Sequence, residues 1–228
     1  MPQFSSPLYR DQSALQSKAV LKTNLKANDR TVCRSSLGME SGAIPDDSIT
    51  ASSQMRLRPG DSRYAPFRGR LNLVTGDAGW AAVGTATIGE WLQVDLGEMK
   101  HVTGIITQGG MWYSPQMWVT SFKLQYSTDA TCWVTYATSD GSDKVFSGNT
   151  DATTPVINML PDPIDVRYVR FLPQAWYFSM SMRVEVLGCR AYRSGGSGHT
   201  SPGCGRDQGN RVIPKLEGTD THVDAGLF

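Results

Sequence analysis

Histidine, cysteine and long apolar runs are scarce in this 228-residue chain, which has three histidines and four cysteines. No apolar run approaches the roughly 20 residues that a helix needs to cross a bilayer, so no membrane span is expected. A basic start followed by an apolar segment is missing from residues 1–32, so no signal peptide is visible. Charged residues make up 19% of the chain, below the roughly 25% of an average soluble domain, which disfavours long charged helices and coiled coils.

An excess of either charge is missing as well. The 22 basic and 21 acidic residues give a net charge of +1, which argues against nucleic acid as a partner held by bulk charge. The sum hides a local excess, because five arginines lie between residues 56 and 70 with only Asp61 opposing them. They are Arg56, Arg58, Arg63, Arg68 and Arg70. This arginine cluster points to an anionic surface as the ligand.

A catalytic constellation is also lacking. Two of the three histidines lie in the loose C-terminal tail, and no nucleophile forms a credible pair with His101. The glycine-rich stretch from Gly195 fits neither the phosphate-loop nor the GxSxG pattern. The adjacent Asp46 and Asp47 follow Pro45 and are interpreted as residues that organise a turn. We therefore expect no enzymatic activity and no cofactor.

The cysteines stand at positions 33, 132, 189 and 204, with no CxxC pair and no nearby histidine, so no metal site is expected. Cys33 and Cys189 bracket the central segment, and a bridge between them would imply an oxidising compartment. A buried free thiol is the simplest interpretation of Cys132. Pairing of Cys132 with Cys204, or with another chain, is the alternative.

What the sequence has in quantity is short alternating runs separated by Gly, Asp, Asn and Pro, which predict an antiparallel sandwich or barrel. In EWLQVDLG (residues 90–97), Leu92, Val94 and Leu96 fall on one face of a strand. Similar alternation covers residues 122–126, 168–172 and 182–186. We assign an all-β domain to residues 33–189, a partly disordered N-terminal extension to 1–32, and a flexible, glycine- and serine-rich C-terminal tail to 190–228.

Seven segments in order carry a family resemblance: LGMESGAIPDDSITASSQ, RLNL, GEWLQVDLG, VTGIITQG, VFSGNTD, RYVRFLP and MRVEVLGC. Together they resemble the discoidin domain, also called the factor five/eight type C domain, between Cys33 and Cys189. The resemblance implies a distorted jelly-roll β-barrel of about eight strands, of the galactose-binding-domain-like kind. It also implies a disulfide between Cys33 and Cys189, and ligand-binding loops that project from one end of the barrel.

Two of these loops have compositions suited to binding. The first loop, residues 54–70, interleaves apolar residues with the five arginines, and the third loop, residues 110–118, reads GMWYSPQMW without a charge. Exposed aromatic side chains suit a bilayer interface, a sugar face or a protein contact. The predicted ligand-binding residues are Met55, Arg56, Leu57, Arg58, Arg63, Met111, Trp112 and Tyr113.

Structural roles are the alternative for several residues near these loops. Some of the arginines, Arg70 in particular, are expected to pair with Asp61, Asp77 or core carboxylates. Trp80, in the second loop at residues 75–84, is expected to pack against the domain, and Trp118 is expected to be buried if it belongs to the following strand. Trp91, Trp133 and Trp176 are assigned to structure.

These observations predict an extracellular, secreted or cell-surface adhesion module that attaches to anionic phospholipid or to glycans. The first alternative is a lectin for galactose-type or sulfated glycans, and the second is a protein-binding domain of a larger receptor or matrix protein. Because no signal peptide is visible, an extracellular location implies a fragment of a longer chain, a misassigned N-terminus or unconventional export.

Overall fold

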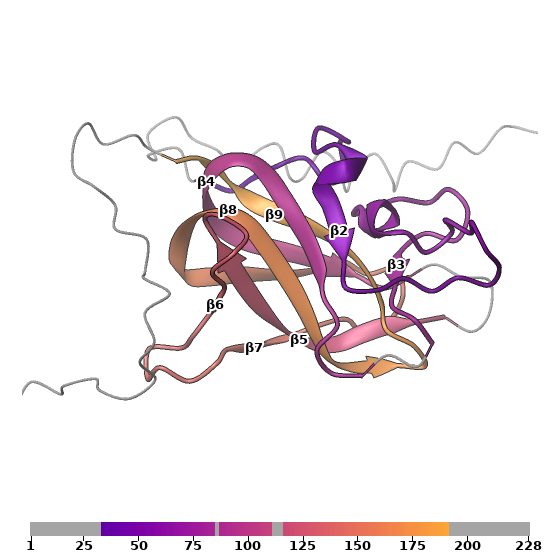
Figure 1. Ribbon diagram of the computed structural model, residues 1–228. Coiled ribbons are helices and arrows are strands. Elements are labelled where there is room, and N and C mark those ends of the chain that lie inside the picture. Colours follow the sequence, from indigo (N-terminus) through magenta and orange to yellow (C-terminus); the bar gives the residue numbers. More distant parts are fainter. Residues whose placement is uncertain (1–32, 85–86, 111–115, 192–228) are drawn as a thin grey trace, which may run out of the picture.

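The computed structural model describes residues 33–84, 87–110 and 116–191, which form an almost entirely β structure (Figure 1). The described chain forms nine strands: β1 (Ser35–Ser36), β2 (Ile49–Ala51), β3 (Trp80–Ala81), β4 (Leu92–Gln108), β5 (Trp118–Ser127), β6 (Val134–Thr135), β7 (Val145–Ser147), β8 (Val156–Tyr177) and β9 (Ser181–Arg190). Two short 3-10 helices, η1 (Asp46–Ser48) and η2 (Pro66–Gly69), lie in the connections. Among the described residues, no helix is long and apolar enough to cross a membrane.

Antiparallel pairing joins all nine strands, and the main path of neighbours runs β1-β9-β4-β8-β5-β6. The three remaining strands attach at the side of this path: β2 pairs with β4, β3 with β9, and β7 with β5. The long strands β4 and β8 bend, because their pairing shifts register between Asp95 and Lys100, where Gly97 adopts a positive φ of 77°. Strongly bent strands let one sheet curl around a core. The all-β jelly-roll expectation is therefore confirmed.

The core follows the predicted alternation in most strands. Leu92, Val94 and Leu96 of β4 are buried, while Gln93 and Asp95 between them are partly exposed. Phe122 and Leu124 of β5 and Val169 and Phe171 of β8 join the same buried cluster. Strand β9 departs from alternation, because every residue from 181 to 188 is buried, including the two charged ones.

Glu185 and Arg183 are the buried charged residues of β9, and both are less than 2% exposed. The Glu185 carboxylate accepts hydrogen bonds from the backbone N–H groups of Gly38, Met39 and Glu40, at 3.3, 3.1 and 3.0 Å. These donors satisfy a carboxylate that would otherwise be costly to bury. The turn at residues 38–40 therefore covers the face of β9 that alternation assigns to solvent.

A disulfide joins Cys33 to Cys189, as the resemblance implied, across a sequence separation of 156 residues. In the chain-entropy model, a loop of this length contributes roughly 5 kcal/mol to stability. Cys132 is also in a disulfide, so its interpretation as a free thiol is wrong. The partner of Cys132 lies outside the described residues.

The barrel has two distinct ends. At one end lie the start of the first loop after β2, the short strand β3, the base of the third loop between β4 and β5, and the turn between β8 and β9 (Figure 1, right-hand side). We call this the loop end. At the opposite end lie the bend of β4 near Gly97 and the Cys33–Cys189 disulfide, where Lys100 pairs with Arg190 and His101 with Cys189.

Candidate ligand-binding loops

Strand β3 ties the connections of the loop end together. Trp80 pairs with Met182 of β9, and the backbone N–H of Ala82 donates to the carbonyl of Met180 at 3.1 Å. From the first loop, the N–H of Met55 donates to the carbonyl of Ala81 at 2.8 Å. The loop end is therefore a connected platform, in which the first loop and the β8–β9 turn lie on either side of β3.

A small apolar cluster lies under this platform. Tyr64, Ala81 and Met117 are buried together, and Met55 packs against them. Burial raises the pKa of the Tyr64 hydroxyl to about 12. Gly110 N–H donates to the carbonyl of Met117 at 2.8 Å and closes the base of the third loop over the same cluster. Met55, predicted to bind ligand, therefore lies partly buried at the base of the first loop.

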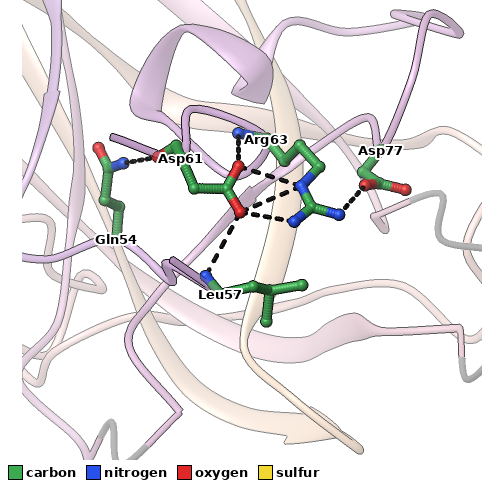
Figure 2. A network of polar contacts seen from close by, with 5 residues as sticks. All are labelled: Gln54, Leu57, Asp61, Arg63 and Asp77. Carbon is green, nitrogen blue, oxygen red and sulfur yellow. Dashed lines mark hydrogen bonds and ion pairs between the residues drawn. The ribbon is translucent and has the colours of Figure 1, made fainter. Parts of the chain in front are cut away.

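Asp61 organises the first loop, as Figure 2 shows. Its carboxylate accepts from the Nε and Nη2 atoms of Arg63, at 3.0 and 2.7 Å, and from the backbone N–H of Leu57 at 3.4 Å. Its backbone carbonyl accepts from the side-chain amide of Gln54 at 3.1 Å. The side-chain hydrogen bond from Arg63 holds the pKa of Asp61 well below its usual range. Leu57 and Arg63, on either side of Asp61 in the loop, are thus both fixed to its carboxylate.

Arg63 is balanced by acidic neighbours on two sides. Besides Asp61, its Nη1 atom lies 3.7 Å from Asp77 of the second loop (Figure 2). Arg70 is paired too, with Asp46, and its guanidinium also donates to the carbonyls of Ile44 and Met39, at 2.7 and 3.1 Å. The expected pairing with Asp61 and Asp77 is confirmed for Arg63. Arg70 pairs with a carboxylate that the expectation did not name, because Asp46 is exposed and not part of the core.

The tip of the first loop, made of Arg56, Leu57 and Arg58, is exposed. Leu57 has 52% of its surface exposed, and neither neighbouring guanidinium forms an ion pair with any residue that the structure describes. An exposed leucine between two exposed arginines can enter an apolar layer while the arginines meet anions at its surface. The other predicted contacts, Met111, Trp112 and Tyr113, lie outside the described residues.

The tryptophans of the described core have structural contacts. Trp80 is fully buried and its indole N–H donates to the carbonyl of Ser53 at 2.9 Å, which confirms its structural assignment. Trp91 and Trp133 enclose the guanidinium of Arg170, which lies 4.1 and 3.6 Å from their ring centroids. Trp118 begins β5, is half-buried, and stacks on Tyr177 with ring centroids 4.2 Å apart.

Arg183 supports the loop end from inside, a role that alternation along β9 did not reveal. Its guanidinium donates to the carbonyls of Gly109, Leu73 and Ala152, at 2.7, 2.8 and 2.7 Å. Burial lowers the pKa of Arg183 to about 10. The three carbonyls belong to three separate connections, so one side chain holds together the base of the third loop, the segment before β3 and the β7–β8 connection.

The described residues contain no cluster of metal ligands. Within residues 33–84, 87–110 and 116–191, no group of three or more His, Cys, Asp or Glu side chains is placed to hold a metal ion. Asp46 lies in η1, where it accepts from Arg70, in line with its interpretation as an organiser of the local turn. The side chains exposed at the tip of the first loop are basic and apolar.

Comparison with known proteins agrees with this architecture. A family model described as the F5/8 type C domain matches residues 48–186. The chain belongs to the F5/8 type C, or discoidin, family.

The chain is similar to two curated relatives and to one solved structure. It is 40% identical to rat (Rattus norvegicus) lactadherin over 160 residues, which are 69% of this chain and 36% of lactadherin. It is 38% identical to human (Homo sapiens) coagulation factor VIII over 174 residues, which are 76% of this chain and 7% of that protein. The chain thus spans about a third of lactadherin and less than a tenth of factor VIII. Discoidin II from Dictyostelium discoideum shares the discoidin fold, with a TM-score of 0.54, 22% identity, and coverage of 63% of this chain and 55% of that chain.

Proposed function

We propose that this discoidin domain is an extracellular adhesion module that attaches to anionic phospholipid surfaces through its loop end. The observation that carries the proposal is the tip of the first loop, where exposed Leu57 lies between exposed Arg56 and Arg58. A basic residue near an anionic membrane contributes about 1 kcal/mol, and each buried CH₂ group contributes about 0.8 kcal/mol. Two arginines and one leucine, together with further side chains of the loop end, are enough for reversible attachment.

Charge placement supports an oriented attachment. Residues 33–189 contain 12 basic and 15 acidic residues, so the domain carries a net charge of −3 (12 minus 15) and is repelled as a whole by an anionic surface. Arg56 and Arg58 reverse this sign at the loop end. A membrane therefore attracts the loop end and repels the acidic body, which directs the tip of the first loop toward the headgroups.

An oxidising location is supported by the cysteines. The Cys33–Cys189 bridge and the second disulfide at Cys132 are of a kind that persists in secreted and cell-surface proteins and is rare in reducing compartments. Anionic phospholipid is accessible from the cell exterior wherever phosphatidylserine is exposed on the outer leaflet.

Vesicle binding tests the proposal. Sedimentation with vesicles of phosphatidylcholine alone, and of phosphatidylcholine with phosphatidylserine, is expected to show binding only to the second, weakened by salt. The double change Arg56→Gln with Arg58→Gln removes about 2 kcal/mol, which corresponds to a roughly thirtyfold loss of affinity. The matched control is Arg34→Gln with Arg190→Gln, which removes the same charge at the opposite end and should change affinity less than twofold.

Three results would reject a phospholipid ligand. The first is equal, negligible binding to both vesicle types, and the second is an equal loss of affinity in both double variants. The third is binding on a glycan array that free monosaccharide inhibits, without preference for phosphatidylserine, which would favour the lectin alternative.

A further inference from the structure

The turn between β8 and β9 presents two large aromatic side chains to solvent. Tyr177 is 53% exposed and Phe178 is 65% exposed, the largest exposed fraction of any aromatic side chain among the described residues. Phe178 has a positive φ of 58°, and the N–H of Ser179 donates to the carbonyl of Tyr177 at 2.7 Å. A three-residue turn with a positive central φ is strained, and glycine, not phenylalanine, is the residue that adopts it at low cost.

The turn is held rigidly from below. Met180 is buried, its carbonyl accepts from the N–H of Ala82, and the hydroxyl of Ser181 donates to the carbonyl of Trp80 at 2.9 Å. On the other flank, Tyr177 stacks on Trp118 at the edge of the third loop. These contacts fix the two strands and leave Phe178 at the apex. Neither the burial nor the backbone preference of Phe178 explains why a large aromatic residue stands there.

The position of the turn suggests an explanation. It lies at the loop end, one strand away from the first loop, because β3 bonds to Met55 on one side and to Met180 on the other. Val83, just after β3, is a further exposed apolar residue on this platform. Residues 173–182, which contain the turn, carry no charge. An uncharged, rigidly supported aromatic apex beside a basic tip matches the side chains that occupy a bilayer interface.

We propose that the β8–β9 turn is a second lipid-contacting element of this domain, in which Phe178 inserts into the acyl boundary and Tyr177 lies at the headgroup level. The inference rests on the proposed attachment to phospholipid and adds a contact separate from the first and third loops. Backbone strain is commonly retained at functional sites, and here it holds an aromatic ring outward on a fixed turn. Insertion of a phenylalanine side chain corresponds to about a tenfold gain in affinity.

The test substitutes Phe178→Gly in the full chain. Glycine takes the positive φ without strain, so the unfolding midpoint should stay unchanged or rise, while affinity for phosphatidylserine vesicles falls about tenfold. Phe178→Asn, which also tolerates this backbone, should behave alike. Met99→Ala removes an exposed apolar side chain near the bend of β4, at the opposite end, and should bind as the unmodified protein does.

A depth measurement separates insertion from a structural role. Phe178→Trp should retain binding and add tryptophan fluorescence that bromine atoms on the acyl chains quench, whereas Met99→Trp should add fluorescence that is not quenched. Unmodified affinity in Phe178→Gly, or no quenching in Phe178→Trp, would overturn the inference while leaving the first-loop proposal standing. Absence of vesicle binding by the unmodified protein would instead overturn the proposed function itself.

Discussion

Arg183 shows how a single buried charge can shape a binding surface that it does not reach. Each of its three guanidinium nitrogens donates to a carbonyl of a separate connection, and no carboxylate among the described residues pairs with it. Hydrogen bonds that involve a charged group contribute roughly 1.5 to 3 kcal/mol each, and carbonyls left unsatisfied in the interior add a penalty. The three bonds therefore fix the relative positions of the connections at the loop end.

Replacing this side chain should be costly. We expect Arg183→Met, which keeps apolar bulk but removes all donors, to lower the free energy of unfolding by at least about 3 kcal/mol. Arg183→Lys should recover only part of the loss, because one ammonium group cannot reach three divergent carbonyls. Chemical denaturation monitored by tryptophan fluorescence measures both. Arg34→Met, at an exposed position, is the control and should leave the midpoint unchanged.

For single residues, the sequence predicted which side chains are charged and exposed better than it predicted which side chains form ion pairs. The arginine cluster was visible, and the exposed tip at Arg56, Leu57 and Arg58 lies within it. Asp61 was an expected partner of the cluster, but the sequence did not indicate that Arg63, two residues away, is the arginine that pairs with it. The exposure of Phe178 was not predicted, because the sequence around it is typical of a strand. Its side chain is exposed only because the chain turns there after β8.

At the scale of elements, β9 is the long strand that alternation along the sequence predicts least well. It pairs with β1, β3 and β4, and it carries both buried charges. Period-two alternation predicted Leu92, Val94 and Leu96 correctly because β4 has one covered face there. Alternation fails for β9 because the turn at residues 38–40 and the loop-end connections cover its second face. Such coverage comes from distant segments, which a local pattern cannot indicate.

The pairing of β9 with β4 requires glycine at position 188. A Cβ atom at Gly188 would lie 2.2 Å from the carbonyl oxygen of His101, beside the bulge where β4 shifts register between Val102 and Gly104. We expect Gly188→Ala to force the strands apart and to lower the free energy of unfolding by at least about 2 kcal/mol. Gly84→Ala is the matched control, since its Cβ would meet open space. Equal unfolding midpoints for the two variants would contradict this account.

The whole molecule combines a rigid, disulfide-closed barrel with carboxylates that are held ionised. The pKa of Asp151 is lowered to about 2, first by the backbone N–H of Thr154, and that of Asp140 to about 2, first by the hydroxyl of Thr138. The backbone N–H of Cys132 lowers the pKa of Asp129, and the side chain of Arg63 lowers that of Asp61. These four residues lie in four different connections, so the surface loops as a group depend on ionised aspartates.

Because the loops depend on ionised aspartates, the stability of the fold should decrease in acid. A carboxyl whose pKa is lower in the folded state than its ordinary 3.8 stabilises the fold fully above that value and loses the contribution as the pH falls toward 2. We therefore expect the melting temperature to be insensitive to these groups between pH 7 and about pH 5 and to fall steeply between about pH 4 and pH 2. Calorimetry at constant ionic strength measures this profile. Asp151→Asn keeps the acceptor oxygen but cannot titrate, so its melting temperature should fall less over the acid range. A melting temperature that rises on acidification, or an unchanged slope in Asp151→Asn, would show that these carboxylates do not control the stability of the loops.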